Sequence, residues 1–106
     1  MAKLILLLRR RSGTTREQSL TYWASGAHTE LVEKLPGLQK YVQNATTGGP
    51  GASDCDGVGE LWFASEAARD QALDSPEMAQ VLENGKIFLD MDRTSILTVS
   101  DTTVIG

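Results

Sequence analysis

The sequence of 106 residues contains few of the side chains that bind metals or form disulfides. It has one cysteine, Cys55, and one histidine, His28, so an intrachain disulfide is excluded and no ligand cluster for a metal is available. A single cysteine fits a reducing compartment, and we expect a cytoplasmic protein. The two neighbours of Cys55 are aspartates, which are not the positive surroundings of a reactive thiol.

The glycine motifs that bind common cofactors are also missing. Residues 48–51 (GGPG) have no following lysine and no strand–loop–helix context, so they do not predict a phosphate-binding loop. They belong to a glycine-rich stretch, residues 46–54, that predicts an exposed loop. No dinucleotide fingerprint is present, and we expect neither a cofactor nor a metal.

Long apolar runs and an excess of positive charge are absent as well. The run Leu4–Leu8 is too short for a signal sequence, and the main positive charge follows it rather than precedes it. No segment is long enough to span a bilayer. The net charge is −4, and the basic run Arg9–Arg11 is too short to indicate a nucleic-acid binder. We therefore expect neither a membrane nor a nucleic acid as partner.

The patterns that are present fit a single domain over residues 1–106. Thr14 with Glu17, or Thr15 with Gln18, matches a capping box at the start of a helix, and a proline–glycine pair ends that helix. The expected order is strand, helix, strand, strand, two helices and strand, at residues 3–11, 16–35, 38–44, 57–63, 66–73, 76–85 and 94–99.

This order predicts an α+β class, a ferredoxin-like split β-α-β fold with an antiparallel sheet and helices on one face. The other face would be open. Alternation, however, places Val58 and Trp62 on one face of their strand, and Leu61 and Phe63 on the other. An open apolar face in so small a domain predicts a second copy as partner. We expect a homodimer through this face, forming a dimeric α/β barrel.

His28 is the first candidate for chemistry because a histidine titrates near neutral pH. Helical spacing places it on the shoulder of the apolar stripe, where partial burial favours the neutral form that acts as a base. The alternative is a structural histidine at the edge of the core. In this prediction Gly26 lies mid-helix and leaves room for a ligand or for close packing, whereas Tyr22 points to the opposite side.

Four further residues are candidates for binding a small-molecule substrate. Tyr41 can hydrogen-bond a substrate oxygen or be an ordinary strand aromatic, and Trp62 is expected to line the same pocket. Glu60 lies between apolar neighbours and needs a partner, which Arg9 or Arg11 can supply. A buried ion pair is the default interpretation of Glu60, and a catalytic acid is the second. Arg9 can also orient or attract an anionic substrate.

Several stretches taken together resemble the EthD family, named from ethyl tert-butyl ether degradation. The similarity runs from Leu4 to about Leu97. Its most specific pieces are Tyr22-Trp23 ahead of His28, Leu35-Pro36-Gly37-Leu38 with Tyr41, and Asp56-Gly57 before Glu60-Leu61-Trp62-Phe63. The chain departs from the family pattern at Glu30, where relatives often have proline, and at Asn84, where an aspartate is common.

The resemblance implies a dimeric α/β barrel that works without metal or organic cofactor, with His28 at the position of the usual catalytic candidate. Relatives include ether-degradation accessory proteins, polyketide-type dehydratases or decarboxylases and a methylmuconolactone methylisomerase, and they carry a loose oxidoreductase label. We therefore expect histidine-assisted proton transfer on a hydrophobic, oxygenated molecule such as a lactone or polyketide, as in an isomerase or lyase. The alternatives are a non-catalytic accessory or ligand-binding dimer, and a cofactorless monooxygenase.

Overall fold

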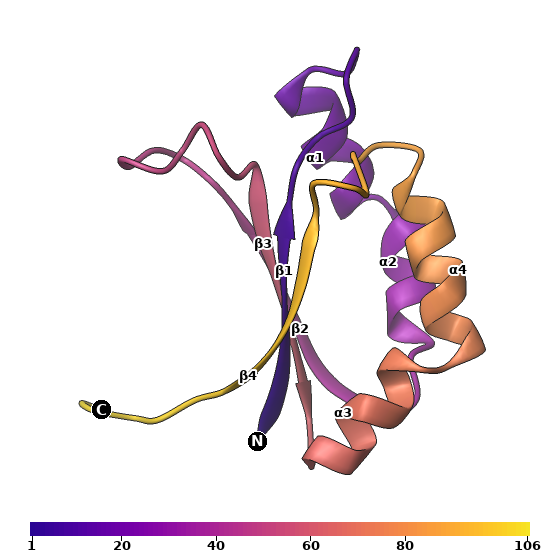
Figure 1. The fold of residues 1–106 in the computed structure, drawn as a ribbon. Helices are drawn as coiled ribbons and strands as arrows, with labels where there is room; N and C mark the ends of the chain where they lie inside the picture. Colours follow the sequence, from indigo (N-terminus) through magenta and orange to yellow (C-terminus); the bar gives the residue numbers. More distant parts are fainter.

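Four strands form one antiparallel sheet in the order β2-β3-β1-β4, and four helices cover one of its faces (Figure 1). The computed structural model describes residues 1–106. The ferredoxin-like α+β fold predicted from the sequence is confirmed. The elements are β1 (Ala2–Leu8), α1 (Arg16–Ala24), α2 (Gly26–Glu33), β2 (Leu38–Ala45), β3 (Gly57–Phe63), α3 (Glu66–Leu73), α4 (Pro76–Gly85) and β4 (Ser95–Ser100).

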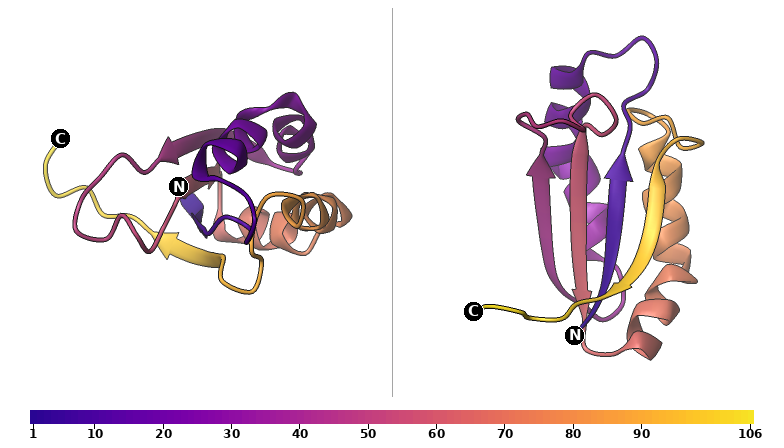
Figure 2. Two further views of the ribbon diagram at one scale, coloured as in Figure 1. Left: turned by 90° about the horizontal axis from the view of Figure 1, so that it is seen from above. Right: turned by 60° about the vertical axis from the view of Figure 1, so that its left-hand side comes forward.

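The register of the two central strands decides which side chains meet the helices. Leu4 of β1 lies opposite Leu61 of β3, and both are buried under the helix layer. The alternate positions, such as Ile5 opposite Glu60, point to the other face. No helix covers that face, as the two turned views show (Figure 2). The alternation predicted for residues 57–63 is therefore confirmed.

The predicted single helix over residues 16–35 is wrong, because the chain breaks at Ser25. Ser25 has extended backbone angles, φ −74° and ψ 156°, and it both ends α1 and caps α2. Gly26 is consequently the first residue of α2 rather than a mid-helix residue. It is exposed, and an added Cβ would contact only the Glu30 side chain. Gly26 therefore opens no space beside His28.

One other boundary differs from the expected one, and the structure selects one of the two possible caps of α1. The first strand ends at Leu8, so Arg9–Arg11 lie in the loop that follows it. Of the two possible caps of α1, Thr15 is the one used: its hydroxyl accepts from the Gln18 N–H, and the Gln18 side chain accepts from the Thr15 N–H. The capping box satisfies two backbone donors that would otherwise be unpaired at the start of α1.

Trp23 joins α1 to the sheet through two glycines of β3. The indole is 4% exposed. A Cβ placed on Gly57 would lie 2.9 Å from Trp23 Cζ3, and one placed on Gly59 would lie 3.5 Å from Cζ2. The absence of side chains at these two positions lets the indole pack directly against the strand. None of the helices is long and apolar enough to cross a membrane.

Candidate active site

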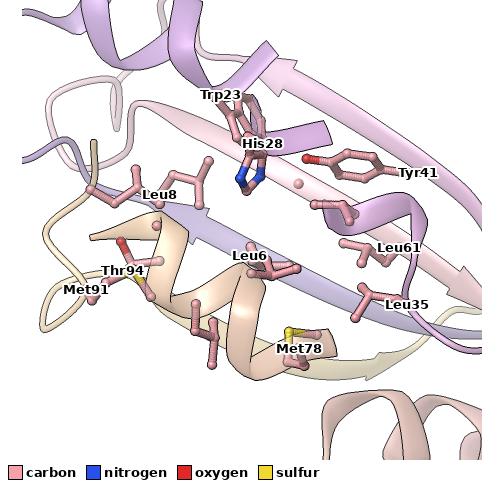
Figure 3. A pocket seen from close by; sticks show the side chains of 16 residues that line it. Leu6, Leu8, Trp23, His28, Leu35, Tyr41, Leu61, Met78, Met91 and Thr94 are labelled. Carbon is pink, nitrogen blue, oxygen red and sulfur yellow. The ribbon is translucent and has the colours of Figure 1, made fainter. Parts of the chain in front are cut away.

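A cavity of about 30 Å³ lies between the helices and the covered face of the sheet (Figure 3). Its lining is mainly apolar and comes from strands β1, β2 and β3, from helices α1, α2 and α4, and from the segment before β4. Leu6, Trp23, Leu61, Met78 and Met91 are among the residues that line it. Two side chains that can exchange protons or donate hydrogen bonds, His28 of α2 and Tyr41 of β2, also line this cavity. The structure thus brings together two of the five residues proposed from the sequence.

His28 is held by a hydrogen-bonded chain that crosses from α2 to α4 and back to α1. Its Nδ1 lies 2.9 Å from Asn84 Oδ1, and Asn84 Nδ2 donates to the Tyr22 hydroxyl at 3.0 Å. The ring of Phe88 packs edge-on against the imidazole, with centroids 5.2 Å apart, and also contacts Tyr22. These contacts fix both the position and the rotation of the imidazole.

The orientation of the Asn84 amide sets the tautomer of His28. Because Asn84 Nδ2 faces Tyr22, its Oδ1 faces the imidazole and accepts a hydrogen bond from Nδ1–H. The neutral ring then carries its lone pair on Nε2, which has no partner in the protein and is not fully enclosed. His28 is 5% exposed, and burial lowers its pKa from the ordinary value of 6.5, an effect that the hydrogen bond to Asn84 partly offsets. Neutral His28 is therefore prepared to act as a base at physiological pH.

The lowered pKa predicts that stability depends on pH through His28. The protonated imidazole is disfavoured in the folded state, so this contribution is fully present above pH 6.5 and is lost as the pH falls through the lower folded-state pKa. We expect the Cε1 proton of the single histidine to titrate below 6.5 by NMR, and the free energy of unfolding in urea to fall over that range. In His28→Gln, this part of the dependence of unfolding free energy on pH should be absent. An NMR titration midpoint of 6.5 for His28 would contradict the effect of burial on its pKa.

Tyr41 supplies a hydrogen-bond donor to the same cavity. Gln43 Nε2 donates to the Tyr41 hydroxyl at 2.8 Å and to the Trp23 carbonyl at 2.8 Å. The Tyr41 oxygen accepts this bond, so its own proton is free, and the hydroxyl points toward the His28 side of the cavity (Figure 3). Burial raises the pKa of Tyr41, with partial compensation from hydrogen bonding to Gln43 and Trp23, so the phenol stays protonated. The cavity thus pairs one base with one neutral donor.

The volume of the cavity limits what it holds in this conformation. About 30 Å³ accommodates roughly one water molecule and is far below the several hundred Å³ of a drug-sized pocket. Leu89 and Met91 line both the cavity and a surface hollow of about 380 Å³, so they form the wall between the two. Met91 Sδ occupies the space above Gly85, where an added Cβ would lie 2.9 Å away. Access for a larger ligand requires this flexible side chain to move.

Trp62 and Glu60 do not line this cavity, and their expected place beside His28 within one chain is wrong. Both lie on the open face of the sheet, because β3 alternates its side chains. Glu60 pairs with Lys3 at 2.9 Å and accepts from Asn44 at 3.0 Å, rather than pairing with an arginine. The Lys3 and Asn44 bonds lower the pKa of Glu60, and Lys3 also lies over the Trp62 ring.

Arg9 is also remote from His28. It lines a separate polar hollow beyond the end of β1, where Nη1 donates to the Ser53 carbonyl at 3.4 Å and lies 3.9 Å from an Asp54 oxygen. The roles proposed for Trp62, Glu60 and Arg9 therefore do not belong to the His28 cavity of a single chain. No group of three or more His, Cys, Asp or Glu side chains is arranged to hold a metal ion.

Sequence reasoning missed three residues that build the site. A continuous helix points Tyr22 away from His28, and the break at Ser25 removes this constraint, so that the Tyr22 hydroxyl reaches Asn84. In the sequence Asn84 stands out only as a departure from the family pattern, although it orients the imidazole. Gln43 gave no signal except its place on the same strand face as Tyr41, two residues along β2.

The fold and cavity define a class: a ferredoxin-like α+β domain with one buried, oriented histidine at an apolar cavity. The EthD domain model matches residues 11–92, so this chain belongs to the EthD family. No curated protein sequence matches it.

Solved structures share the fold of this chain. An ethyl tert-butyl ether degradation (EthD) family protein of Bacillus halodurans superposes with a TM-score of 0.78 at 20% identity, over 96% of this chain and 99% of that one. A dimeric ferredoxin-like protein of unknown function from Thermobifida fusca has a TM-score of 0.65 at 20% identity, over 93% and 89%. SnoaB, a cofactor-independent oxygenase from Streptomyces nogalater, has a TM-score of 0.67 at 10% identity, over 99% and 97%. At these identities the likeness concerns the fold.

Proposed function

We propose that this protein is a cofactor-independent enzyme that moves a proton on a hydrophobic, oxygenated small molecule of the lactone or polyketide type. The observation that carries the proposal is the His28 imidazole, whose Nδ1 is bound by Asn84 while Nε2 is left without a protein partner at an apolar cavity. A structural histidine normally has both ring nitrogens satisfied or in water. Leaving the basic nitrogen unpaired beside a cavity suits a general base.

The chemistry follows from the two polar groups of the cavity. His28 Nε2 takes a proton from a carbon next to a carbonyl, and the electron pair of that C–H bond moves onto the carbonyl oxygen. The Tyr41 O–H donates a hydrogen bond to the resulting enolate oxygen, which stabilises the developing charge in apolar surroundings. The proton on Nε2 then returns to a different carbon, giving isomerisation. Alternatively the enolate re-forms the carbonyl and expels a β-hydroxyl group, which takes the proton from Nε2 and leaves as water, giving elimination.

Deuterium uptake tests this proposal without knowledge of the final product. An α,β-unsaturated γ-lactone and anthrone are each incubated with the protein in D₂O, and exchange at the activated carbon is followed by NMR. The proposal predicts exchange well above the buffer rate. Binding of either compound without exchange indicates a non-catalytic ligand-binding protein instead. Oxygen consumption with anthrone, abolished by removing air, indicates a cofactor-independent oxygenase that uses the same proton abstraction.

We also propose that the protein is a homodimer through the open face of the sheet. Support comes from the apolar side chains that alternate onto this face and are only partly buried: Ile5, Leu7, Val42, Val58, Trp62, Leu97 and Val99. Residues 101–106 and the loop after β2 also extend on this side of the sheet, away from the helices (Figures 1 and 2). Val104 and Ile105 in that tail are 87% and 93% exposed, as expected for residues that a second copy covers.

A charge placed on this face should break the dimer. Leu97 of β4 is 43% exposed and lies next to Ile5, so Leu97→Glu puts an unpaired carboxylate in the proposed interface. We expect the dissociation constant to rise by at least about 10²-fold, because an unpaired buried charge is costly. Light scattering after size exclusion measures the mass. Ile87→Glu, at a 52% exposed position beyond α4, is the matched control and should stay dimeric. A monomeric wild type refutes the interface.

A further inference from the structure

A second concave site lies beyond the end of β1, separate from the His28 cavity. It is a hollow of about 300 Å³, and none of the side chains that line it is hydrophobic. Three loops form it: the one after β1, the one before β3 and the one before β4, which gather at the same end of the sheet (Figure 1). None of its residues lines the His28 cavity. Its function is therefore independent of the proton transfer proposed above.

Arginines dominate this hollow. Arg9, Arg10, Arg11 and Arg93 all line it, which is four of the six arginines in a chain whose net charge is −4. Like charges held this close repel one another, so their gathering in one hollow of an acidic protein calls for a compensating anion.

Part of this cluster is rigidly fixed. Asp56 is 8% exposed and accepts from the Arg10 backbone N–H at 2.8 Å and from Arg10 Nη1 at 2.9 Å. The Asp56 charge is therefore used within the protein, and it fixes the course of the loop after β1. This pair positions the neighbouring arginines without needing a ligand.

The remaining arginines keep most of their donors free. Arg11 and Arg93 form no ion pair, and Arg9 makes only the two long contacts to the loop before β3. The backbone N–H groups of Ser12 and Gly13 are likewise without a backbone or side-chain acceptor. Asp90 is the one carboxylate lining the hollow that has no arginine partner. The free donors and the surplus of positive charge line one hollow.

We propose that this hollow binds a small polyanion that carries a phosphate or pyrophosphate group. Planar guanidinium forks match the oxygens of a phosphate in pairs, and several forks suit a group with more than one negative charge. Gly13, at φ +87°, gives the loop a conformation that leaves its N–H groups free to bind an oxyanion. The volume is sufficient for pyrophosphate or the phosphate end of an ester.

Calorimetry with inorganic pyrophosphate tests the site on the whole protein. We expect one saturable site, weakened about tenfold or more in the double variant Arg11→Gln/Arg93→Gln, because charge-assisted bonds are lost. The matched control Arg16→Gln/Lys34→Gln removes the same charge from two exposed residues outside the hollow and should change affinity less than about twofold. Both arginines of the test pair are exposed, so folding is preserved, which circular dichroism verifies.

Three results would overturn the proposal. The first is that the wild type shows no saturable pyrophosphate binding. The second is that both double variants lose affinity equally, which means that only diffuse charge attracts the anion. The third is that citrate binds more tightly than pyrophosphate, which assigns the site to carboxylates. Conversely, Asp90→Asn should tighten pyrophosphate binding, because it removes the carboxylate that repels the ligand.

Discussion

Replacing His28 with glutamine is expected to lower the rate of deuterium exchange by about 10²–10⁴-fold, the usual contribution of one positioned general base. Glutamine has no basic nitrogen, so the base is lost, while a polar side chain is kept at this buried position. Thr29→Ala, one residue along α2 and outside the cavity, should keep the full rate. Exchange is measured by NMR with the same lactone and anthrone.

Asn84 provides a sharper version of the same test because it acts on His28 and not on substrate. Asn84→Asp places a carboxylate against Nδ1, 2.9 Å away in the wild type, and a negative neighbour raises the pKa of an imidazole. The rate–pH profile should therefore move to higher pH. A structural role for the hydrogen bond would alter stability but leave the profile in place, so the pH midpoint separates the two roles.

Full deuterium-exchange activity in His28→Gln would show that His28 is not the base. If His28→Gln lowers the exchange rate only in part, Tyr41→Phe helps to interpret the result, because it deletes only the hydroxyl to which Gln43 donates. If Tyr41 stabilises the enolate, this variant lowers the rate without moving the pH midpoint set by His28. The two variants therefore report on different atoms of one cavity.

Local patterns in the sequence were sufficient to predict most of the fold. Residues 57–63 and 66–73 have the predicted limits, since glycine, alternating apolar residues and a serine cap each act within a few residues. The break at Ser25 was not predictable from hydrophobic periodicity, because the apolar stripe continues across it. Ser25 has extended backbone angles, whereas the spacing of apolar residues carries no information on the backbone angles of one polar residue between them.

The candidate site was harder to predict because its parts are distant in the sequence. His28 and Asn84 are 56 residues apart, and Asn84 and Tyr22 are 62 apart. Nothing local to Asn84 indicates that its amide faces α2. Trp62 shows a different error: it is expected to line the pocket, although the alternation of β3, already evident in the sequence, places its ring on the other face from Leu61.

Trp23→Ala is expected to cost about 3–5 kcal/mol of unfolding free energy, the usual penalty for deleting a buried indole. Trp23 is 4% exposed, lies on Gly57 and Gly59 of β3, and also lines the His28 cavity. The same side chain thus attaches α1 to the sheet and forms a wall of the candidate site. Urea unfolding followed by far-UV circular dichroism measures the loss.

A double-mutant cycle with Gly57 tests whether packing of the indole against β3 causes the loss of stability in Trp23→Ala. Gly57→Ala puts a Cβ 2.9 Å from Trp23 Cζ3 and 3.3 Å from the Asn44 carbonyl, so we expect a cost of about 1–3 kcal/mol from overpacking. In the Trp23→Ala background the indole is gone, and the same change should cost less, giving a clear coupling energy. Gly48→Ala, whose Cβ would meet nothing within 4 Å, is the matched glycine control. Additive effects of Trp23→Ala and Gly57→Ala would show that the glycines of β3 are there for another reason than to admit the indole.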